Sequence, residues 1–90
     1  MNEILKDIRK MAVFAVVARE GSFTGAAQSL GLGKSIVSEH VSQLELELGV
    51  QLLKRSTRRL SLTEAGTACL HHCEQVLEEA EAVRAVVQQL

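Results

Sequence analysis

The sequence predicts a mainly α-helical chain with three short helices, a two-stranded β-hairpin and one long final helix. Three observations support this fold class. The 90 residues contain no proline, which favours helices. Six glycines then supply the breaks between helical segments, and only the stretch after Gly49 changes to an extended pattern. With 47% hydrophobic residues, the chain can bury one small core and leaves no room for a second domain of ordinary size.

The first helix is expected from about Ile4 to Arg19 and ends at Gly21. Its second half, residues 11–18, is MAVFAVVA, which is apolar on every side and rich in alanine, so that helix is favoured over strand. A helix that is apolar all round must be covered on more than one face. We interpret this segment as a first indication that the chain forms a dimer.

A second helix is expected over Phe23–Leu30, with Ser22 as its N-cap. Ala26 and Ala27 lie on its inner side, where small side chains allow another helix to cross closely. The segment Gly31-Leu32-Gly33 provides a short turn before the next helix. Two helices joined by so short a turn predict a helix-turn-helix unit.

The third helix is expected over Lys34–Leu48 and is closed by Gly49. Its apolar residues recur at intervals of four, three and four, as one buried helix face requires; they are Val37, Val41, Leu44 and Leu48. The opposite face is short and polar, formed by Ser35, Ser38, Glu39 and Ser42, with Lys34 at its amino end. An ordinary solvated face is the alternative, but it would usually carry more long Glu and Lys side chains. The small residues favour close approach to another macromolecule.

Two extended segments are expected after Gly49, at Gln51–Leu53 and Leu60–Leu62. Between them, residues 54–59 (KRSTRR) hold four cations and no acid. Two strands joined by a basic tip form a β-hairpin, or wing, that can lie along a phosphate backbone. An ordinary charged loop is the alternative for part of this segment.

The last helix is expected to begin after Thr63, its N-cap, and to run to the final residue, with Glu64 near its positive end. Apolar residues then alternate at intervals of four and three in a heptad seam; they are Cys69, Cys73, Val76, Ala80, Val83, Val87 and Leu90. So long a helix cannot bury the whole seam on so small a domain. We therefore expect it to pair with a second copy of the chain.

The formal charge of −1 does not by itself indicate a nucleic-acid binder, but its distribution is uneven. Residues 1–62 carry nine cations and six acids, for +3, whereas residues 63–90 carry one cation and five acids, for −4. Two Phe and no Trp or Tyr argue against a single-strand binder that stacks bases on aromatic side chains. The longest apolar run has eight residues, too few to span a membrane, and the amino terminus lacks the pattern of a signal peptide. We expect a cytoplasmic protein without a membrane partner.

Cys69, His72 and Cys73 lie at positions i, i+3 and i+4, which invites a metal-site interpretation. The two cysteines also occupy seam positions, where cysteine behaves as a small hydrophobic residue, so structural packing is favoured over a metal site or a thiol switch. The sequence shows no Ser/His/Asp or paired-carboxylate pattern of a catalytic site. We expect no enzyme activity, no cofactor and no metal.

The order of helix, tight turn, helix and basic hairpin is the layout of a winged helix-turn-helix. From residue 5 to residue 90 the chain resembles the LysR-type transcriptional regulators. Four ordered blocks carry the resemblance: FAVVAREGSFTGAA (14–27), VSEHVSQLE (37–45), LGVQLLKR (48–55) and TRRLSLTEAG (57–66).

The resemblance implies sequence-specific binding of double-stranded DNA by a bacterial regulator. Residues 1–62 are then the winged helix-turn-helix DNA-binding domain and residues 63–90 the linker and dimerisation helix. The third helix enters the major groove, the wing reaches the minor groove, and the homodimer recognises an interrupted inverted repeat. A tetramer is an option for the full-length protein. The alternative function is a helical dimerisation or adaptor module that binds protein rather than DNA.

The resemblance also assigns roles to individual residues. The base-reading positions are Lys34, Ser35, Ser38 and Glu39. Phosphate contacts are assigned to Ser22, Thr24, His40, Ser42, Lys54, Arg55 and Arg59, of which the last three are alternatively used in intramolecular pairing. Arg58 is the wing residue assigned to the minor groove.

The sequence departs from the family pattern in the third helix and in its length. Many members have Gln or Lys at Lys34, Pro at Ser35 and Arg or Lys at Glu39. A carboxylate at Glu39 is repelled by phosphates, so it either accepts a hydrogen bond from cytosine N4 or orients Lys34 or Arg55. Members also carry a larger carboxy-terminal domain that binds a small-molecule effector. That domain is absent from this chain, which we expect to be an amino-terminal fragment.

Overall fold

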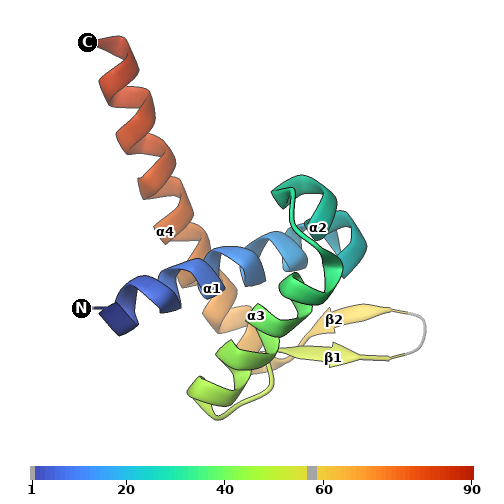
Figure 1. The fold of residues 1–90 in the computed structure, drawn as a ribbon. Helices are drawn as coiled ribbons and strands as arrows, with labels where there is room; N and C mark the ends of the chain where they lie inside the picture. The colour runs from blue at the N-terminus through green and yellow to red at the C-terminus, as the bar shows by residue number, and fades with distance from the viewer. Residues whose placement is uncertain (1, 57–58) are drawn as a thin grey trace.

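The computed structural model describes residues 2–56 and 59–90 and contains four helices and one antiparallel hairpin (Figure 1). The elements are α1 (Asn2–Glu20), α2 (Phe23–Leu30), α3 (Lys34–Leu48), β1 (Leu53–Arg55), β2 (Leu60–Leu62) and α4 (Glu64–Gln89). The predicted mainly α-helical fold with a two-stranded wing and a long final helix is confirmed. None of the helices described is both long and apolar enough to cross a membrane.

The predicted helix ends are confirmed by their capping geometry. Gly21 and Gly49 follow α1 and α3 with φ values of 73° and 72°, in the left-handed region that favours glycine. The side-chain oxygens of Ser22 and Thr63 accept hydrogen bonds of 2.9 Å from the amides of Gly25 and Gly66. These side chains satisfy amides that the first turns of α2 and α4 would otherwise leave unpaired.

The first strand differs from its predicted position: β1 covers Leu53–Arg55 and not Gln51–Leu53. Leu53 pairs with Leu62 and Arg55 with Leu60, whereas the backbone before Leu53 is bound elsewhere. The carbonyls of Gln51 and Leu52 accept hydrogen bonds from the hydroxyl and the amide of Thr63. Residues 51–52 therefore connect the wing to the start of α4 and do not extend the ladder.

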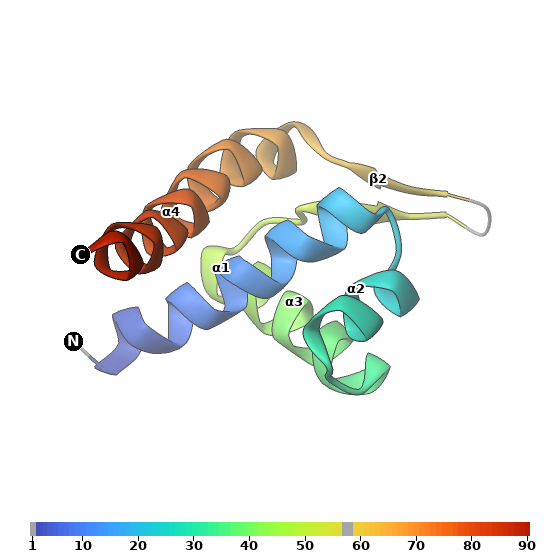
Figure 2. The same cartoon turned by 90° about the horizontal axis from the view of Figure 1, so that it is seen from above.

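Helix α1 lies at the centre of the domain, between α4 on one side and α2 and α3 on the other (Figure 2). The buried apolar core comprises Val13, Phe14, Ala15, Val17, Ala26, Ala27, Val37, Val41, Leu44, Leu52, Leu53 and Cys73. The sequence suggested that the apolar half of α1 indicates a dimer. This interpretation is wrong, because α4 of the same chain covers the second face of α1.

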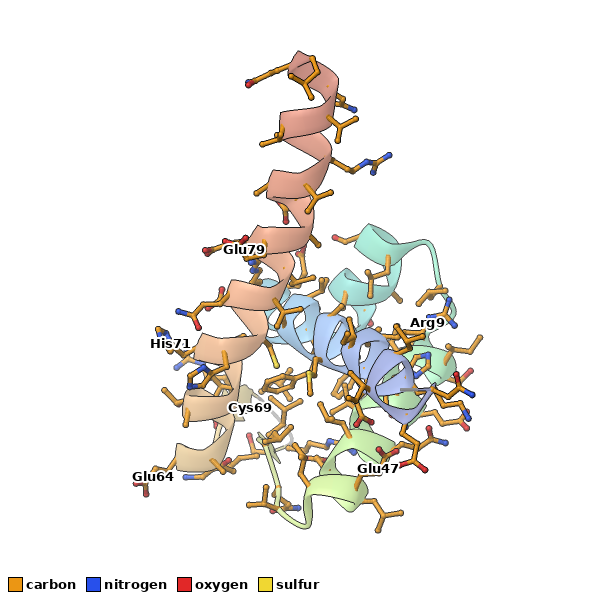
Figure 3. The ribbon with its side chains drawn as sticks, turned by 90° about the vertical axis from the view of Figure 1, so that its left-hand side faces the viewer. Arg9, Glu47, Glu64, Cys69, His71 and Glu79 are labelled. Carbon is orange, nitrogen blue, oxygen red and sulfur yellow. The ribbon has the colours of Figure 1, made fainter. Side chains whose placement is uncertain are left out.

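Helix α4 has two parts that differ in their surroundings. In the proximal part, residues 64–77, Gly66 and Cys73 are buried, and Cys69, Leu70 and Leu77 pack against the core. In the distal part, residues 78–90, every residue is exposed, and the helix stands clear of the domain (Figure 3). The chain is elongated for this reason, with extents of 48 × 27 × 22 Å. The residues of the predicted heptad seam of α4 therefore have two different surroundings. Cys73 belongs to the core of its own chain, whereas Val83 and Val87 are 64% and 63% exposed.

Candidate nucleic-acid interface

The outer face of α3 is exposed and lined by small polar side chains. Lys34, Ser35, Glu39 and Ser42 are exposed and Ser38 is half-buried. On the opposite side Val37, Val41 and Leu44 are buried in the core, whereas Leu48, the predicted fourth residue of this stripe, is exposed at the end of the helix. Within the helix, the Glu39 carboxylate accepts a hydrogen bond of 3.2 Å from the Gln43 amide. The helix is thus anchored from behind and presents short side chains outward, so that a ligand surface can approach its backbone.

The start of α2 and the base of the wing meet beside this face. Ser22, Phe23 and Thr24 line a shallow groove together with Lys34, Arg55, Ser56 and Arg59. Thr24 is exposed, and the oxygen of Ser22 is engaged in capping α2. The structure therefore brings together Lys34, the predicted residues at the start of α2 and two of the predicted wing cations.

Arg55 is held by three residues, one from α2 and two from α3. Its guanidinium lies 5.2 Å from the centroid of the Phe23 ring, a cation–π geometry. The Nη2 atom of Arg55 is 3.5 Å from the Ser42 hydroxyl and 3.4 Å from Oε1 of Glu45. Arg55 therefore makes the intramolecular pairing that the sequence left as an alternative, and its partner is Glu45 and not Glu39.

Glu45 connects α3 to the wing. Its second oxygen, Oε2, accepts hydrogen bonds of 2.8 Å from the amide of Leu52 and 3.2 Å from the amide of Leu53. Because one carboxylate binds both the start of β1 and the Arg55 side chain, it fixes the wing relative to α3. Sequence reasoning missed Glu45 and Phe23. The only available signal was an acid at the edge of the buried stripe of α3.

The wing carries further cations. Lys54 and Arg59 are exposed, and the Ser56 hydroxyl donates to the carbonyl of Arg59 at 2.8 Å and lies 3.2 Å from its amide. Arg58, the residue assigned to the minor groove, lies outside the described residues. The described part of the wing thus offers exposed positive charge beside the outer face of α3.

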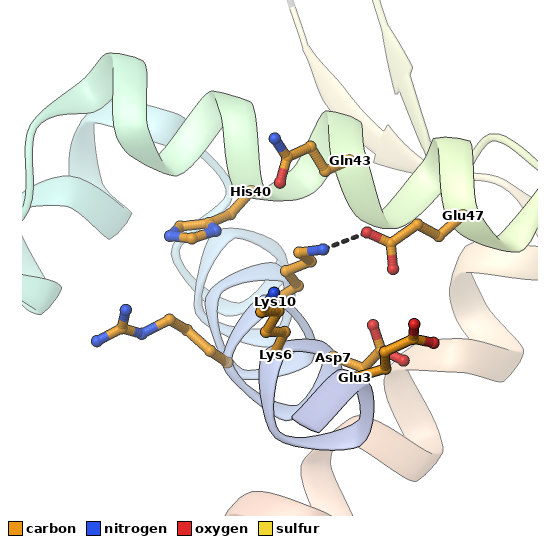
Figure 4. Close-up of a pocket in the computed structure, with 8 residues that line it drawn as sticks. Glu3, Lys6, Asp7, Lys10, His40, Gln43 and Glu47 are labelled. Atoms are coloured by element: carbon orange, nitrogen blue, oxygen red, sulfur yellow. Dashed lines mark hydrogen bonds and ion pairs between the residues drawn. The ribbon is translucent and has the colours of Figure 1, made fainter. Parts of the chain in front are cut away.

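His40 lies apart from the predicted serines, on the flank of α3 that faces α1. With Lys6, Arg9, Lys10 and Glu47 it lines a second pocket (Figure 4). Its Nδ1 atom is buried and has no hydrogen-bond partner among the described residues. Sequence reasoning did not foresee this pocket, since its walls come from two helices that are about 30 residues apart in the chain.

An ion pair and a carboxyl pair join α1 to α3 in this pocket. The buried Lys10 ammonium donates to the carboxylate of Glu47, and this hydrogen bond, together with the neighbouring Asp7 carboxyl, lowers the pKa of Glu47. The contact with Glu47 raises the pKa of the Asp7 carboxyl. These interactions hold the amino-terminal half of α1 against α3.

The two cysteines pack as apolar side chains. Their sulfur atoms are 3.7 Å apart, Cys73 is buried, and burial raises the pKa of its thiol to about 12. His72, the third residue of the metal-site interpretation, is exposed. Over residues 2–56 and 59–90 we find no cluster of three or more His, Cys, Asp or Glu side chains suited to a metal ion.

Comparison with known proteins identifies the family to which the chain belongs. Residues 8–67 match the family model described as bacterial regulatory helix-turn-helix protein, lysR family. The chain belongs to the LysR family. It is 45% identical over 84 residues to an HTH-type transcriptional regulator of Xanthomonas campestris, an alignment that covers 93% of this chain and 24% of the relative. It is 46% identical over 79 residues to the HTH-type transcriptional activator AaeR of Escherichia coli, covering 88% of this chain and 26% of AaeR. The LysR-family chain thus spans about a quarter of the length of these relatives.

Solved structures of LysR-type regulators have the same fold. The chain aligns with BenM_DBD in its complex with catB site 1 DNA at a TM-score of 0.82 and 29% identity, covering 91% of this chain and 92% of that one. It aligns with the CbnR_DBD–DNA complex at a TM-score of 0.78 and 33% identity, covering 91% and 94%. The described helices and hairpin therefore form the LysR-type winged helix-turn-helix.

Proposed function

We propose that the chain binds double-stranded DNA sequence-specifically, as the DNA-binding domain of a LysR-family transcriptional regulator in the bacterial cytoplasm. The observation that supports this most is the outer face of α3, where exposed small polar residues lie beside the exposed cations of the wing. The similarity of almost the whole chain to domains solved with DNA supports the same proposal. The proposal assigns no reaction, cofactor or metal to the chain.

In this proposal α3 enters the major groove, whose width of about 12 Å admits a helix. Lys34 has the donor to contact guanine O6 and N7, and the hydroxyls of Ser35 and Ser38 contact base edges. Glu39 accepts a hydrogen bond from cytosine N4 in place of the one from Gln43. Since the serine side chains are short, their base contacts require close approach of the helix.

Phosphate contacts surround this face. Ser22 and Thr24 lie at the start of α2, where the helix dipole and free amides favour an anion. Lys54 and Arg59 bind phosphates along the wing, and Arg58 enters the minor groove. Ser42 is already 3.5 Å from the Arg55 guanidinium, so the two contact the backbone as a pair.

Two copies pair through the exposed seam residues of α4, which are Val76, Ala80, Val83, Val87 and Leu90. A two-fold dimer presents two α3 helices and recognises an interrupted inverted repeat. In this proposal effector binding belongs to a carboxy-terminal domain of the full-length regulator, for which a tetramer is an option.

Selection of bound sequences from a random duplex pool tests this function. We expect an inverted repeat, and we expect Ser38→Ala to weaken binding of the selected duplex by about tenfold, since a lost base contact costs roughly 1–3 kcal/mol. Arg58→Ala should weaken it as well, and the matched control Arg84→Ala, in the distal part of α4, should not. Fluorescence anisotropy with labelled duplex measures all three dissociation constants. Failure to select any duplex, or unchanged affinity in both interface variants, contradicts the proposal.

A further inference from the structure

The second pocket lies on the flank of α3 opposite to the wing. Ser42 and Glu45 face the wing, where they contact Arg55. His40 and Glu47 face α1 instead and line the pocket with residues of its first three turns (Figure 4). The outer face of α3 is therefore flanked by the wing on one side and by the amino-terminal half of α1 on the other.

The pocket is lined by three cations and three acids, but two of the cations form no close ion pair in the described part of the chain. Lys10 is paired with Glu47, but no acid among the described residues lies within 4.0 Å of the exposed cations Lys6 and Arg9. The buried Nδ1 atom of His40 also lacks a partner. Two exposed cations that form no ion pair with a described acid thus line one pocket together with the His40 ring.

The acids of the pocket lie to one side. Glu3 and Asp7 are across the Lys6 and Lys10 side chains from His40 (Figure 4). Asp7 is also engaged with Glu47. An anion that enters beside His40 therefore meets the cations before it meets the carboxylates.

A helix in the major groove lies between two sugar–phosphate backbones, one along each flank. On the wing flank, Lys54 and Arg59 supply exposed cations for one backbone. On the other flank, the corresponding cations are those of the pocket. We propose that Lys6, Arg9 and His40 form a phosphate-binding site that contacts the DNA backbone on the side of α3 opposite to the wing. This inference rests on the proposed DNA-binding function and adds α1 to the interface.

In this site Lys6 and Arg9 make charge-assisted contacts with a phosphate, and the His40 ring lines the same pocket. The Lys10–Glu47 pair does not touch the phosphate. It positions α1 against α3, so that the groups from the two helices converge.

Salt-dependent binding tests the site on DNA. Lys6→Gln and Arg9→Gln each remove one cation from an exposed side chain, and Arg84→Gln in the distal part of α4 is the matched control. We expect each pocket variant to reduce the slope of log K against log salt by about 1, and to weaken selected and scrambled duplexes by the same factor, because phosphate contacts carry no sequence information. The control should leave slope and affinity unchanged.

Inorganic phosphate tests the pocket without DNA. The ring signals of His40 are followed by NMR during a phosphate titration at constant ionic strength set with chloride, and Arg9→Gln is measured alongside. We expect a saturable phosphate-specific shift that the variant weakens. Reduced salt slopes, with or without this shift, support the backbone assignment. A shift with unchanged slopes retains a phosphate site and assigns it to a free phosphate. Unchanged slopes and no shift overturn the proposal.

These outcomes are separable from failure of the proposed function. If the unaltered chain binds a selected duplex and Ser38→Ala weakens it, DNA binding stands whatever the pocket variants do. If the unaltered chain selects no duplex, the proposed function fails, and the phosphate titration alone decides whether the pocket binds an oxyanion.

Discussion

The proximal and distal parts of α4 share one sequence pattern and have different surroundings. Apolar residues follow the four–three spacing through both parts. In the proximal part, Cys73 is 3% exposed and belongs to the core of the domain. In the distal part, Val83 is 64% exposed and is not among the described residues that pack against the core. The spacing therefore defines which face of a helix is apolar, but not which partner covers that face.

The two parts also differ in how they are attached. The proximal part is bound to the wing through Thr63, to the core through Cys69, Leu70 and Cys73, and to α1 through an ion pair between Arg19 and Glu74. Among the residues that the structure describes, none beyond residue 77 belongs to the core or forms an ion pair. The following changes test this division, in decreasing order of their expected effect.

Gly66→Ala should have the largest effect. A Cβ at this position would lie 2.0 Å from the carbonyl oxygen of Leu52, so α4 must move away from the base of the wing. We expect the free energy of unfolding to fall by more than about 4 kcal/mol, which exceeds the gain of about 1 kcal/mol from the helix propensity of alanine. Urea denaturation measures the loss. Gly33→Ala is the control, because nothing lies within 4 Å of the added Cβ, and a comparable loss there would contradict the steric explanation.

Val83→Asp should act on association and leave folding intact. A carboxylate in a seam that two copies bury must be desolvated, and we expect the dimer dissociation constant to rise by about a hundredfold, or about 3 kcal/mol. Sedimentation equilibrium measures the constant. Gln88→Asp, on the opposite side of the same helix, adds the same charge and should change it little. Equal effects of the two variants would mean that the seam is not the interface.

Leu70→Ala should destabilise the domain, whereas Val83→Ala should not. Leu70 packs against the core, and truncating it removes apolar contacts, with an expected loss of about 2 kcal/mol. Val83 has no such contacts, so we expect less than about 0.5 kcal/mol for its truncation. Denaturation at a concentration low enough to keep the chain monomeric makes this comparison. Equal losses would mean that the distal part also packs on the domain.

Cys73 should make stability fall at high pH. Burial raises the pKa of its thiol from the ordinary value of 9.0 to about 12. Between these values the unfolded chain loses the thiol proton and the folded chain retains it, so the free energy of unfolding decreases as pH rises from about 9 to about 12. The slope from one proton is at most about 1.4 kcal/mol per pH unit. Urea titrations at several pH values should show a shallower decrease for Cys73→Ala than for the unaltered chain.

The ion pair between Arg19 and Glu74 should contribute least. The Nε and Oε2 atoms are 3.2 Å apart, but both side chains are more than one-third exposed, so solvent screens the attraction. We expect a coupling energy of about 0.2–1 kcal/mol in a double-mutant cycle with Arg19→Gln and Glu74→Gln. Moderate salt should reduce it. A coupling that persists in 1 M NaCl would indicate a larger role in orienting α4.

Much of the fold was predictable because its information is local. Helix ends followed from Gly21, Gly31 and Gly49, N-caps from Ser22 and Thr63, and the buried face of α3 from residue spacing. The bounds of β1 were not predictable in this way. They depend on hydrogen bonds that the Glu45 carboxylate accepts and Thr63 donates, which become possible only once α3 and α4 are in place.

The candidate interface was predictable to a similar extent. The small polar face of α3 and the basic wing are evident in the sequence, since each lies within one short segment. The locked position of Arg55 depends on Phe23 and Glu45, which are 32 and 10 residues away in the chain. The pocket around His40 likewise requires the packing of α1 on α3. Contacts between distant segments are set by tertiary packing, and one sequence carries little signal for them.

The junction at Thr63 fixes the start of α4 to the base of the wing, while the far end of the helix lies far from it. The amide and hydroxyl of Thr63 are bonded to Leu52 and Gln51, and the close fit of Gly66 on Leu52 prevents the helix from sliding there. A helix of 26 residues is about 39 Å long, so a tilt of about 5° at the junction displaces its far end by roughly 3 Å. Conversely, a change in the direction of α4 at Leu90 rotates the helix about its junction with the wing. The orientation of the far end of α4 and the orientation of the hairpin are therefore coupled.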